Sequence, residues 1–186
     1  MHACEPYTTY MSLSYDDCVS RVREIVLSRM EHPDASKYWI VFDVDQTLLT
    51  DEKFNHLYSR QGDVYRFMYK GDHSAITPMV DLYNWCKRQG MNMCIITGRS
   101  NHLTKITQDN LVKVGVRACQ RFYTKKGREN TIKYKEACRK EIIDAGGFIL
   151  VNIGDREDDL LITDPNCDTD HAYGYAEYAI KLPSTY

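Results

Sequence analysis

The stretch YWIVFDVDQTLLT, from Tyr38 to Thr50, joins an apolar, β-branched run to two aspartates, Asp43 and Asp45. A continuous apolar run of this length is typical of a buried strand, which we expect to extend from Tyr38 to Asp45. Residues i and i+2 of a strand share a face, so both carboxylates are expected to point into one crevice. The stretch therefore predicts a buried strand that ends in two mutually repelling acids.

Strand-like and helix-like segments alternate along the rest of the chain. A helix that begins near Ser14 is expected first, and later helices are expected between the strands. The expected strands are 38–45, 91–98, 119–124, 148–155 and 178–182. This alternation predicts right-handed crossovers and a mainly parallel central sheet with helices on both faces.

The expected fold class is therefore α/β, as a three-layer, Rossmann-like arrangement. One domain is expected to span residues 1–186, because this length suits a single core. Residues 1–37 would form an N-terminal helical segment. Residues 51–76 would form a small cap insert after the first strand.

Composition narrows the class of partner. A formal net charge of -2 and a pI near 6.3 give no overall basic field, so nucleic acid would need a local patch. The beginning, MHACEPYTTYMSLSY, shows no signal-peptide pattern, and no segment has the apolar length of a membrane helix. The seven cysteines form no C-x-x-C pair, which favours reduced thiols. We expect a cytoplasmic protein without a membrane partner, and the oligomeric state stays open.

Polar side chains follow several expected strands. Thr97 ends the second, and the fourth ends in GDREDD, with Asp155, Asp158 and Asp159. The carboxyl ends of parallel strands meet at one edge of the sheet, where ligands bind. One polar residue there is most often only a strand cap, whereas a set indicates a site. Clustered carboxylates need a hard cation such as Mg²⁺, and a phosphoryl group needs a further cation, for which Lys135 is the candidate.

These segments carry a resemblance to a known family. DVDQT, ITGR, a lysine on the third crossover and GDREDD resemble the four ordered motifs of the haloacid dehalogenase (HAD) superfamily. YKEACR, VNIGD and the ending AIKLPSTY are similar to its class III acid phosphatases, subclass IIIB, a group that includes plant vegetative storage proteins. The likeness implies that Lys135, rather than Lys125, Lys126 or Lys133, is the motif-three lysine.

The resemblance implies a phosphomonoester hydrolase that uses Mg²⁺ and an aspartyl-phosphate intermediate. Asp43 would be the nucleophile. Asp45 would be the general acid and later the general base. We expect crowding by a like charge to raise the pKa of Asp45, while contact with the metal keeps Asp43 ionised. Thr97, Gly98 and Lys135 would bind the phosphoryl oxygens. Thr47 would contribute to the phosphate site by orienting the loop after the strand.

The same resemblance implies a metal site. Its ligands would be Asp43, the backbone carbonyl of Asp45, Asp155 and, through water, Asp159. Asp158 is the alternative to Asp159, although a solvated surface position suits it better. Mn²⁺ or Co²⁺ could replace Mg²⁺, because an oxygen-only site discriminates weakly among such ions.

Three features leave the substrate open. The insert carries aromatic and basic residues that could stack on a nucleotide base or simply pack against the body, which is the preferred interpretation. These residues are Phe54, Tyr58, Tyr65, Phe67 and Tyr69, with Arg60, Arg66 and Lys70. Arg99 could contact substrate or form a surface salt bridge. The segment TKKGR, 124–128, could bind phosphate or be a solvated loop.

Three functional hypotheses follow. The first is a phosphatase for small phosphorylated molecules. The second is a polynucleotide-end or protein phosphatase, because a short insert leaves the crevice open unless another subunit closes it. The third is a storage or binding protein of the same fold, which the presence of Asp43 disfavours.

Overall fold

The main sheet of this protein is parallel throughout the residues that the structure describes. The computed structural model describes residues 8–33, 35–52, 54, 66–160 and 176–183, and within these ranges one sheet has six strands. In spatial order they are β1 (Thr9–Ser12), β8 (Ala176–Lys181), β7 (Phe148–Gly154), β2 (Tyr38–Phe42), β5 (Asn92–Ser100) and β6 (Arg121–Lys125). Every pair of neighbours is parallel. The expected α/β class is confirmed.

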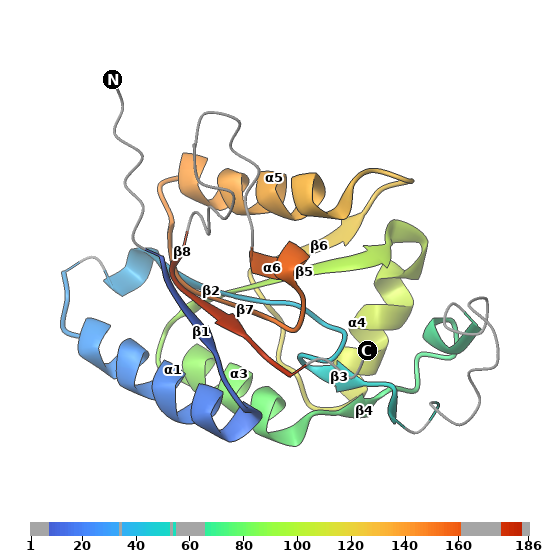
Figure 1. Cartoon of the computed structure of the whole chain (residues 1–186), viewed down its shortest axis with the longest axis horizontal. Coiled ribbons are helices and arrows are strands. Elements are labelled where there is room, and N and C mark those ends of the chain that lie inside the picture. Colours follow the sequence, from blue (N-terminus) through green and yellow to red (C-terminus); the bar gives the residue numbers. More distant parts are fainter. Residues whose placement is uncertain (1–7, 34, 53, 55–65, 161–175, 184–186) are drawn as a thin grey trace.

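Helices cover both faces of the sheet (Figure 1). On one side lie α1 (Tyr15–Arg29), α3 (Thr77–Arg88) and α4 (Thr104–Lys113), and on the other lies α5 (Thr131–Asp144). Successive residues of β2 divide between the two cores: Ile40 and Phe42 pack with α1 and α3, and Val41 packs with α5. The period-two alternation of a strand makes this division, so an apolar run buried on both faces suits the central position.

Local signals in the sequence begin and end these helices. The Ser14 hydroxyl accepts the Asp17 N–H at 3.1 Å and caps α1, and the Asn130 side chain caps α5 by accepting the Lys133 N–H at 3.1 Å. Both bonds satisfy amide groups that lack a partner within the helix. Gly90 follows α3 with a φ of 85°, which a glycine adopts without strain.

The N-terminal segment differs from the expectation. Residues 1–37 were expected to be helical, but β1 precedes α1 and extends the sheet by pairing with β8. This strand is short and mostly exposed, so it lacks the apolar pattern that marks a buried strand. Its pairing is decided by the edge that β8 offers.

The insert is closed at its base by a two-stranded antiparallel ladder. β3 (Leu49–Thr50) pairs with β4 (Ser74–Ala75), so the chain returns beside the point where it left. Residues 53 and 55–65, including Tyr58, Arg60 and Tyr65, lie outside the described residues. The remaining short elements are α6 (Glu157–Leu160) and the 3-10 turns η1 (Ala35–Lys37) and η3 (Asn101–Leu103).

The order of the strands places β2 between β5 and β7. The segments after β2, β5 and β7 therefore emerge side by side at the carboxyl edge of the sheet. The helices of the described ranges are all too short or too polar to cross a lipid bilayer.

Candidate active site

The chain turns sharply after β2. The strand ends at Phe42, three residues earlier than expected, and the Val44 carbonyl accepts the N–H groups of Thr47, Leu48 and Leu49. Gln46 has a φ of 54°, a left-handed conformation that non-glycine residues seldom adopt. The expectation that Asp43 and Asp45 share a strand face is therefore wrong, because the strand ends before both of them. Both residues nevertheless line one cleft, as expected.

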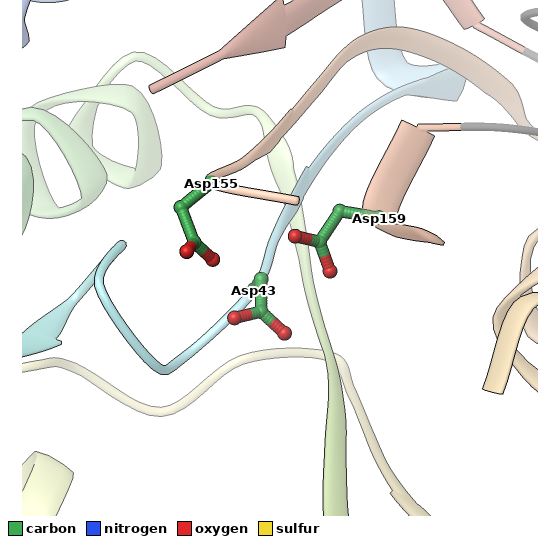
Figure 2. A group of neighbouring side chains, drawn as sticks. All are labelled: Asp43, Asp155 and Asp159. Atoms are coloured by element: carbon green, nitrogen blue, oxygen red, sulfur yellow. The ribbon is translucent and has the colours of Figure 1, made fainter. Parts of the chain in front are cut away.

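Three buried carboxylates gather at the sheet edge (Figure 2). Asp43 follows β2, Asp155 follows β7 and Asp159 lies in α6, and one oxygen from each lies within 4.8 Å of the others. Their exposed fractions are 6%, 3% and 3%. Buried like charges at this separation repel, and a hard divalent cation is the usual way to balance them. An oxygen-only donor set of this kind fits Mg²⁺.

Lys135 adds a positive charge to this cluster. Its Nζ lies 2.9 Å from Asp43 Oδ1 and forms a second ion pair with Asp159. Burial lowers the pKa of Lys135, but the surrounding carboxylates outweigh burial and raise it above the ordinary value. Lys135 therefore stays charged, and the structure places it beside the expected nucleophile.

Burial raises the pKa of Asp43 well above its usual range. The charge of Asp159 raises this pKa further, and Lys135 lowers it only in part. A divalent ion next to Asp43 would act in the opposite direction.

The position of Asp159 is fixed by several contacts. The backbone N–H of Arg156 donates to Asp159 Oδ2 at 2.9 Å, while Arg139 Nη1 and Asn152 Nδ2 donate to the Asp159 carbonyl, both at 2.6 Å. A Cβ on Gly154 would lie 2.3 Å from the Asp159 Cβ, so only glycine fits there. Sequence reasoning assigned no role to Arg139 or Asn152, although both stand in the segments that carried the resemblance.

Asp158 lies nearer the cluster than expected. Its side chain is 18% exposed and its Oδ1 lies 4.0 Å from Lys135 Nζ and 3.6 Å from Arg156 Nε. The expectation of a solvated surface position is wrong, because α6 turns this residue toward the cleft.

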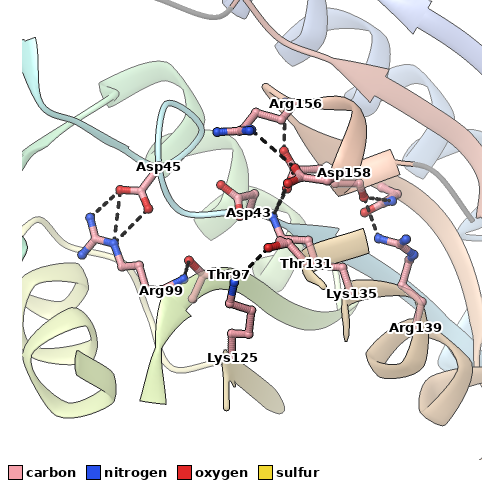
Figure 3. Close-up of polar contacts among 12 residues, drawn as sticks. Asp43, Asp45, Thr97, Arg99, Lys125, Thr131, Lys135, Arg139, Arg156 and Asp158 are labelled. Atoms are coloured by element: carbon pink, nitrogen blue, oxygen red, sulfur yellow. Dashed lines mark hydrogen bonds and ion pairs between the residues drawn. The ribbon is translucent and has the colours of Figure 1, made fainter. Parts of the chain in front are cut away.

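The Asp45 side chain is paired with Arg99 (Figure 3). Arg99 Nη2 donates to Asp45 Oδ1 at 2.6 Å, and Nε lies 3.1 and 3.0 Å from the two carboxylate oxygens. The Arg99 side chain is 0% exposed and also donates to the Thr107 hydroxyl, whereas the Asp45 side chain is 38% exposed. Arg99 is thus neither a surface salt bridge nor a group left free for substrate.

This pair changes the expected protonation of Asp45. Burial raises the pKa of Asp45, but the charge and hydrogen bonds of Arg99 outweigh burial and bring the pKa below its usual value. The expectation of a raised pKa for Asp45 is therefore wrong, whereas the expectation that metal contact keeps Asp43 ionised stays a prediction. The cause is a partner at the end of β5 that lies 54 residues away in the sequence.

The residues expected to bind phosphate lie at the same edge. Thr97 is fully buried and its hydroxyl accepts the Arg99 N–H at 3.2 Å. Gly98 follows it and faces the cleft. Thr47 is also buried, and its hydroxyl has no hydrogen-bond partner among the described residues.

Several of the residues described above line one cleft of about 820 Å³, whereas Thr47, Thr97 and Asp159 are not part of its wall. Acidic, basic and small polar side chains form most of its wall, with Met68 as an apolar contribution. The lining residues are Asp43, Asp45, Gln46, Asp51, Met68, His73, Gly98, Arg99, Ser100, Lys125, Gly127, Arg128, Thr131, Lys135, Asp155, Arg156 and Asp158.

Two aromatic rings of the insert pack against the body. Phe54 and Phe67 stack with ring centroids 4.5 Å apart and are 7% and 6% exposed, and Phe54 also meets His73 edge-on. The preferred packing interpretation is confirmed for these rings. Tyr69 is 59% exposed and does not line the cleft.

Comparison with known proteins identifies relatives of this chain. The model of the HAD superfamily, subfamily IIIB (acid phosphatase), matches residues 1–186. The stem 28 kDa glycoprotein of Glycine max is 29% identical over 146 residues, which are 70% of this chain and 54% of that protein. Acid phosphatase 1 of Solanum lycopersicum is 28% identical over 137 residues (69% and 53%). Vegetative storage protein 1 of Arabidopsis thaliana is 29% identical over 141 residues (71% and 52%). The chain spans about half the length of these relatives.

Solved structures share the fold. The class C acid phosphatase of Bacillus anthracis with tungstate bound superposes with a TM-score of 0.69 at 17% identity, over 92% of this chain and 76% of that one. Another structure of the class C enzyme from the same organism gives a TM-score of 0.67 at 16% identity, over 78% and 62%.

Proposed function

The chain belongs to subfamily IIIB of the HAD superfamily, and on this premise we propose that it is a Mg²⁺-dependent phosphomonoester hydrolase with Asp43 as nucleophile. The observation that carries the proposal is the placement of Asp43. It lies beside Lys135 and two further carboxylates, and it faces the same cleft as Gly98 and Asp45.

The residues of the cleft divide the reaction between them. Asp43 attacks phosphorus, and the bond between phosphorus and the leaving oxygen breaks while Asp45 gives that oxygen a proton. In the second step a water gives its proton to Asp45 and attacks phosphorus, which releases phosphate and restores Asp43. Thr97, Gly98 and Lys135 hold the phosphoryl oxygens throughout.

The acid cluster supports a metal site. Asp43, Asp155 and Asp159 would hold Mg²⁺, which when bound supplies positive charge to the phosphoryl group. Asp45 would contribute only its backbone carbonyl, since its side chain is engaged by Arg99. Asp158 is placed to assist through Lys135 or through water.

Asp45 needs a proton before it can act as an acid. The pKa of Asp45 is low in the substrate-free protein because of Arg99. A phosphate ester bound beside Asp45 adds negative charge, which raises that pKa. Substrate binding and protonation of Asp45 are therefore coupled.

A phosphorylated small molecule is the preferred substrate. The described rings of the insert are buried or outside the cleft wall, so stacking on a nucleic-acid base has little support. The second candidate function is storage, because one relative is a vegetative storage protein. The complete set of acids in this chain favours catalysis.

Phosphate release from p-nitrophenyl phosphate, with Mg²⁺ or with EDTA, tests the proposal. We expect Mg²⁺-dependent turnover that falls by about a thousandfold or more in Asp43→Asn, because this change removes the nucleophile. The turnover of Asp45→Asn is expected to be reduced less, since general acid catalysis contributes about 10²–10⁴-fold. Folded, Mg²⁺-loaded protein that releases no phosphate from any of several phosphoesters would instead support the storage function.

A further inference from the structure

A second group of cations lies beside the phosphoryl site. Lys125 is the last residue of β6, where it pairs with Ser100, and the preceding residue, Thr124, pairs with Thr97. Lys125 is half-buried, and it lines the cleft together with Gly127 and Arg128 of the following loop. The segment 124–128 is therefore one strand away from the expected phosphate-binding residues.

Lys125 is held in place by a neutral partner (Figure 3). Its Nζ donates to the Thr131 hydroxyl at 3.0 Å. Thr131 in turn lies against Gly98, because a Cβ built on that glycine would be 3.4 Å from the Thr131 methyl carbon. The ammonium group is thus positioned before any ligand arrives, which lowers the entropy lost on binding.

The other cations of the cleft have carboxylate partners. Lys135 pairs with Asp43, Arg99 with Asp45, and Arg156 Nε lies 3.6 Å from Asp158. Within the part of the chain that the structure describes, no carboxylate lies within ion-pair distance of Lys125 or Arg128. This side of the cleft therefore carries uncompensated positive charge.

The positive charge of Lys125 and Arg128 is more than the reacting phosphoryl group requires. On the proposed function, Lys135 and a metal at Asp43, Asp155 and Asp159 already balance the charge of that group. Charged and polar side chains predominate among the described lining residues, with Met68 as the one apolar side chain, so the cleft offers charged groups for recognition of the rest of the substrate.

Resting on the proposed function, we infer that the cleft selects phosphomonoesters that carry a second anionic group, a carboxylate or another phosphate, bound by Lys125 and Arg128. The Lys125 ammonium contacts this second group directly. Arg128, exposed in the loop, adds a bidentate donor at the rim.

Matched substrates test the inference. Glycerol 3-phosphate and 3-phosphoglycerate differ by a carboxylate, and fructose 6-phosphate and fructose 1,6-bisphosphate differ by a phosphate. We expect kcat/KM to be about tenfold higher for the more anionic member of each pair, mainly through KM, as one charge-assisted contact allows. This ratio should fall as salt is added.

Substitutions identify the residues responsible. In Lys125→Gln the ratio is expected to fall toward one, and in Arg128→Gln to fall by about threefold, because an exposed cation is screened. Lys126→Gln is the matched control: this neighbour is exposed, does not line the cleft, and should leave the ratio unchanged. A wild-type kcat/KM ratio near one would overturn the inference. An equal loss of kcat/KM for both substrates of a pair in Lys125→Gln would also overturn it, because Lys125 would then act on the reacting phosphoryl group.

Binding without turnover separates this inference from the proposed function. Calorimetry of Mg²⁺-loaded Asp43→Asn with glycerol 3-phosphate and with 3-phosphoglycerate measures the preference in the absence of chemistry. Tighter binding of 3-phosphoglycerate that depends on Lys125 supports the second-anion site even if the wild type hydrolyses neither. Equal binding overturns it even if the wild type is an active phosphatase.

Discussion

Asp43 and Asp45 lie two residues apart in the sequence. Their electrostatic surroundings are nevertheless opposite. Asp43 is 6% exposed among other carboxylates, and its pKa is raised although Lys135 lies 2.9 Å away. The Asp45 side chain is 38% exposed and bound by Arg99, and its pKa is lowered. Both side chains have a cationic partner, so a partner alone does not explain the difference.

The contrast shows that the balance of charges decides the protonation of each acid. Lys135 is shared among Asp43, Asp159 and Asp158, so its charge is divided among three carboxylates. The Arg99 side chain gives Asp45 three hydrogen-bond contacts, and its other side-chain bond goes to the neutral Thr107. Asp43 thus has a deficit of positive charge that a metal ion would fill, whereas Asp45 has none.

The largest expected effect comes from replacing Arg99, which should remove the difference in protonation between Asp43 and Asp45. In Arg99→Gln, burial still raises the pKa of Asp45 while the guanidinium no longer lowers it, so the pH profile of kcat should move to higher pH. We expect kcat at neutral pH to fall by about 10- to 100-fold, because the acid loses its orientation. The free energy of unfolding should drop by about 1–2 kcal/mol, less than for a fully buried pair, since Asp45 is partly exposed.

Two variants control for that result. Arg99→Lys keeps the charge but not the forked geometry, so its kcat should lie between those of the wild type and Arg99→Gln. Arg88→Gln alters an exposed arginine outside the cleft and should change neither kcat nor the pH profile. An unshifted profile in Arg99→Gln would show that Arg99 only supports the fold.

The pH dependence of metal binding sharpens the contrast. Because the pKa of Asp43 is raised in the ion-free protein, Mg²⁺ must displace a proton, and its affinity should increase with pH by up to about tenfold per unit. Calorimetry in buffers of different ionisation enthalpy measures the released proton directly. Asp45→Asn should keep this dependence, since Asp45 is already ionised. An affinity independent of pH would contradict the assignment of the raised pKa to Asp43.

The smallest expected effect concerns His73, which lines the cleft near Asp45. Burial lowers the pKa of His73 below 6.5 and the charge of Arg99 lowers it further, while Asp45 and Asp51 oppose them. The unfolded chain then binds more protons than the folded chain just below pH 6.5, so the unfolding free energy should decrease as pH falls there, with a slope of at most about one proton.

Urea unfolding of wild type and His73→Asn between pH 5 and 7 measures this slope. The variant should show a flatter dependence, because its side chain does not titrate. Identical slopes would show that His73 binds its proton equally in the folded and unfolded chains.

Much of the fold was readable from local patterns. The apolar run before Asp43 predicted a buried strand, and Ser14 predicted the beginning of α1. β1 was missed because it is exposed and has no apolar pattern, and its pairing depends on an edge that forms only when β8 joins the sheet. The β3–β4 ladder was missed because two-residue strands leave no periodic signal.

The sequence predicted which residues belong to the candidate site better than it predicted the contacts between them. Asp43, Asp155, Asp159 and Lys135 come together as expected, because motifs at the ends of parallel strands share one edge. The role of Arg99 was not predictable in the same way. A turn after β2 and the end of β5 must both be in place before an arginine can be seen to hold Asp45.

The sequence by itself determined that this chain forms a parallel α/β sheet, with Asp43, Thr97 and Asp155 at or just after strand ends and Lys135 on a helix between strands. Strand periodicity and motif spacing are local properties, so they can be recognised in the sequence alone. Only the tertiary structure decided which cation each acid meets and which cations, Lys125 and Arg128, are left for a ligand. Pairings of that kind depend on distances between segments far apart in the chain, which local patterns do not record.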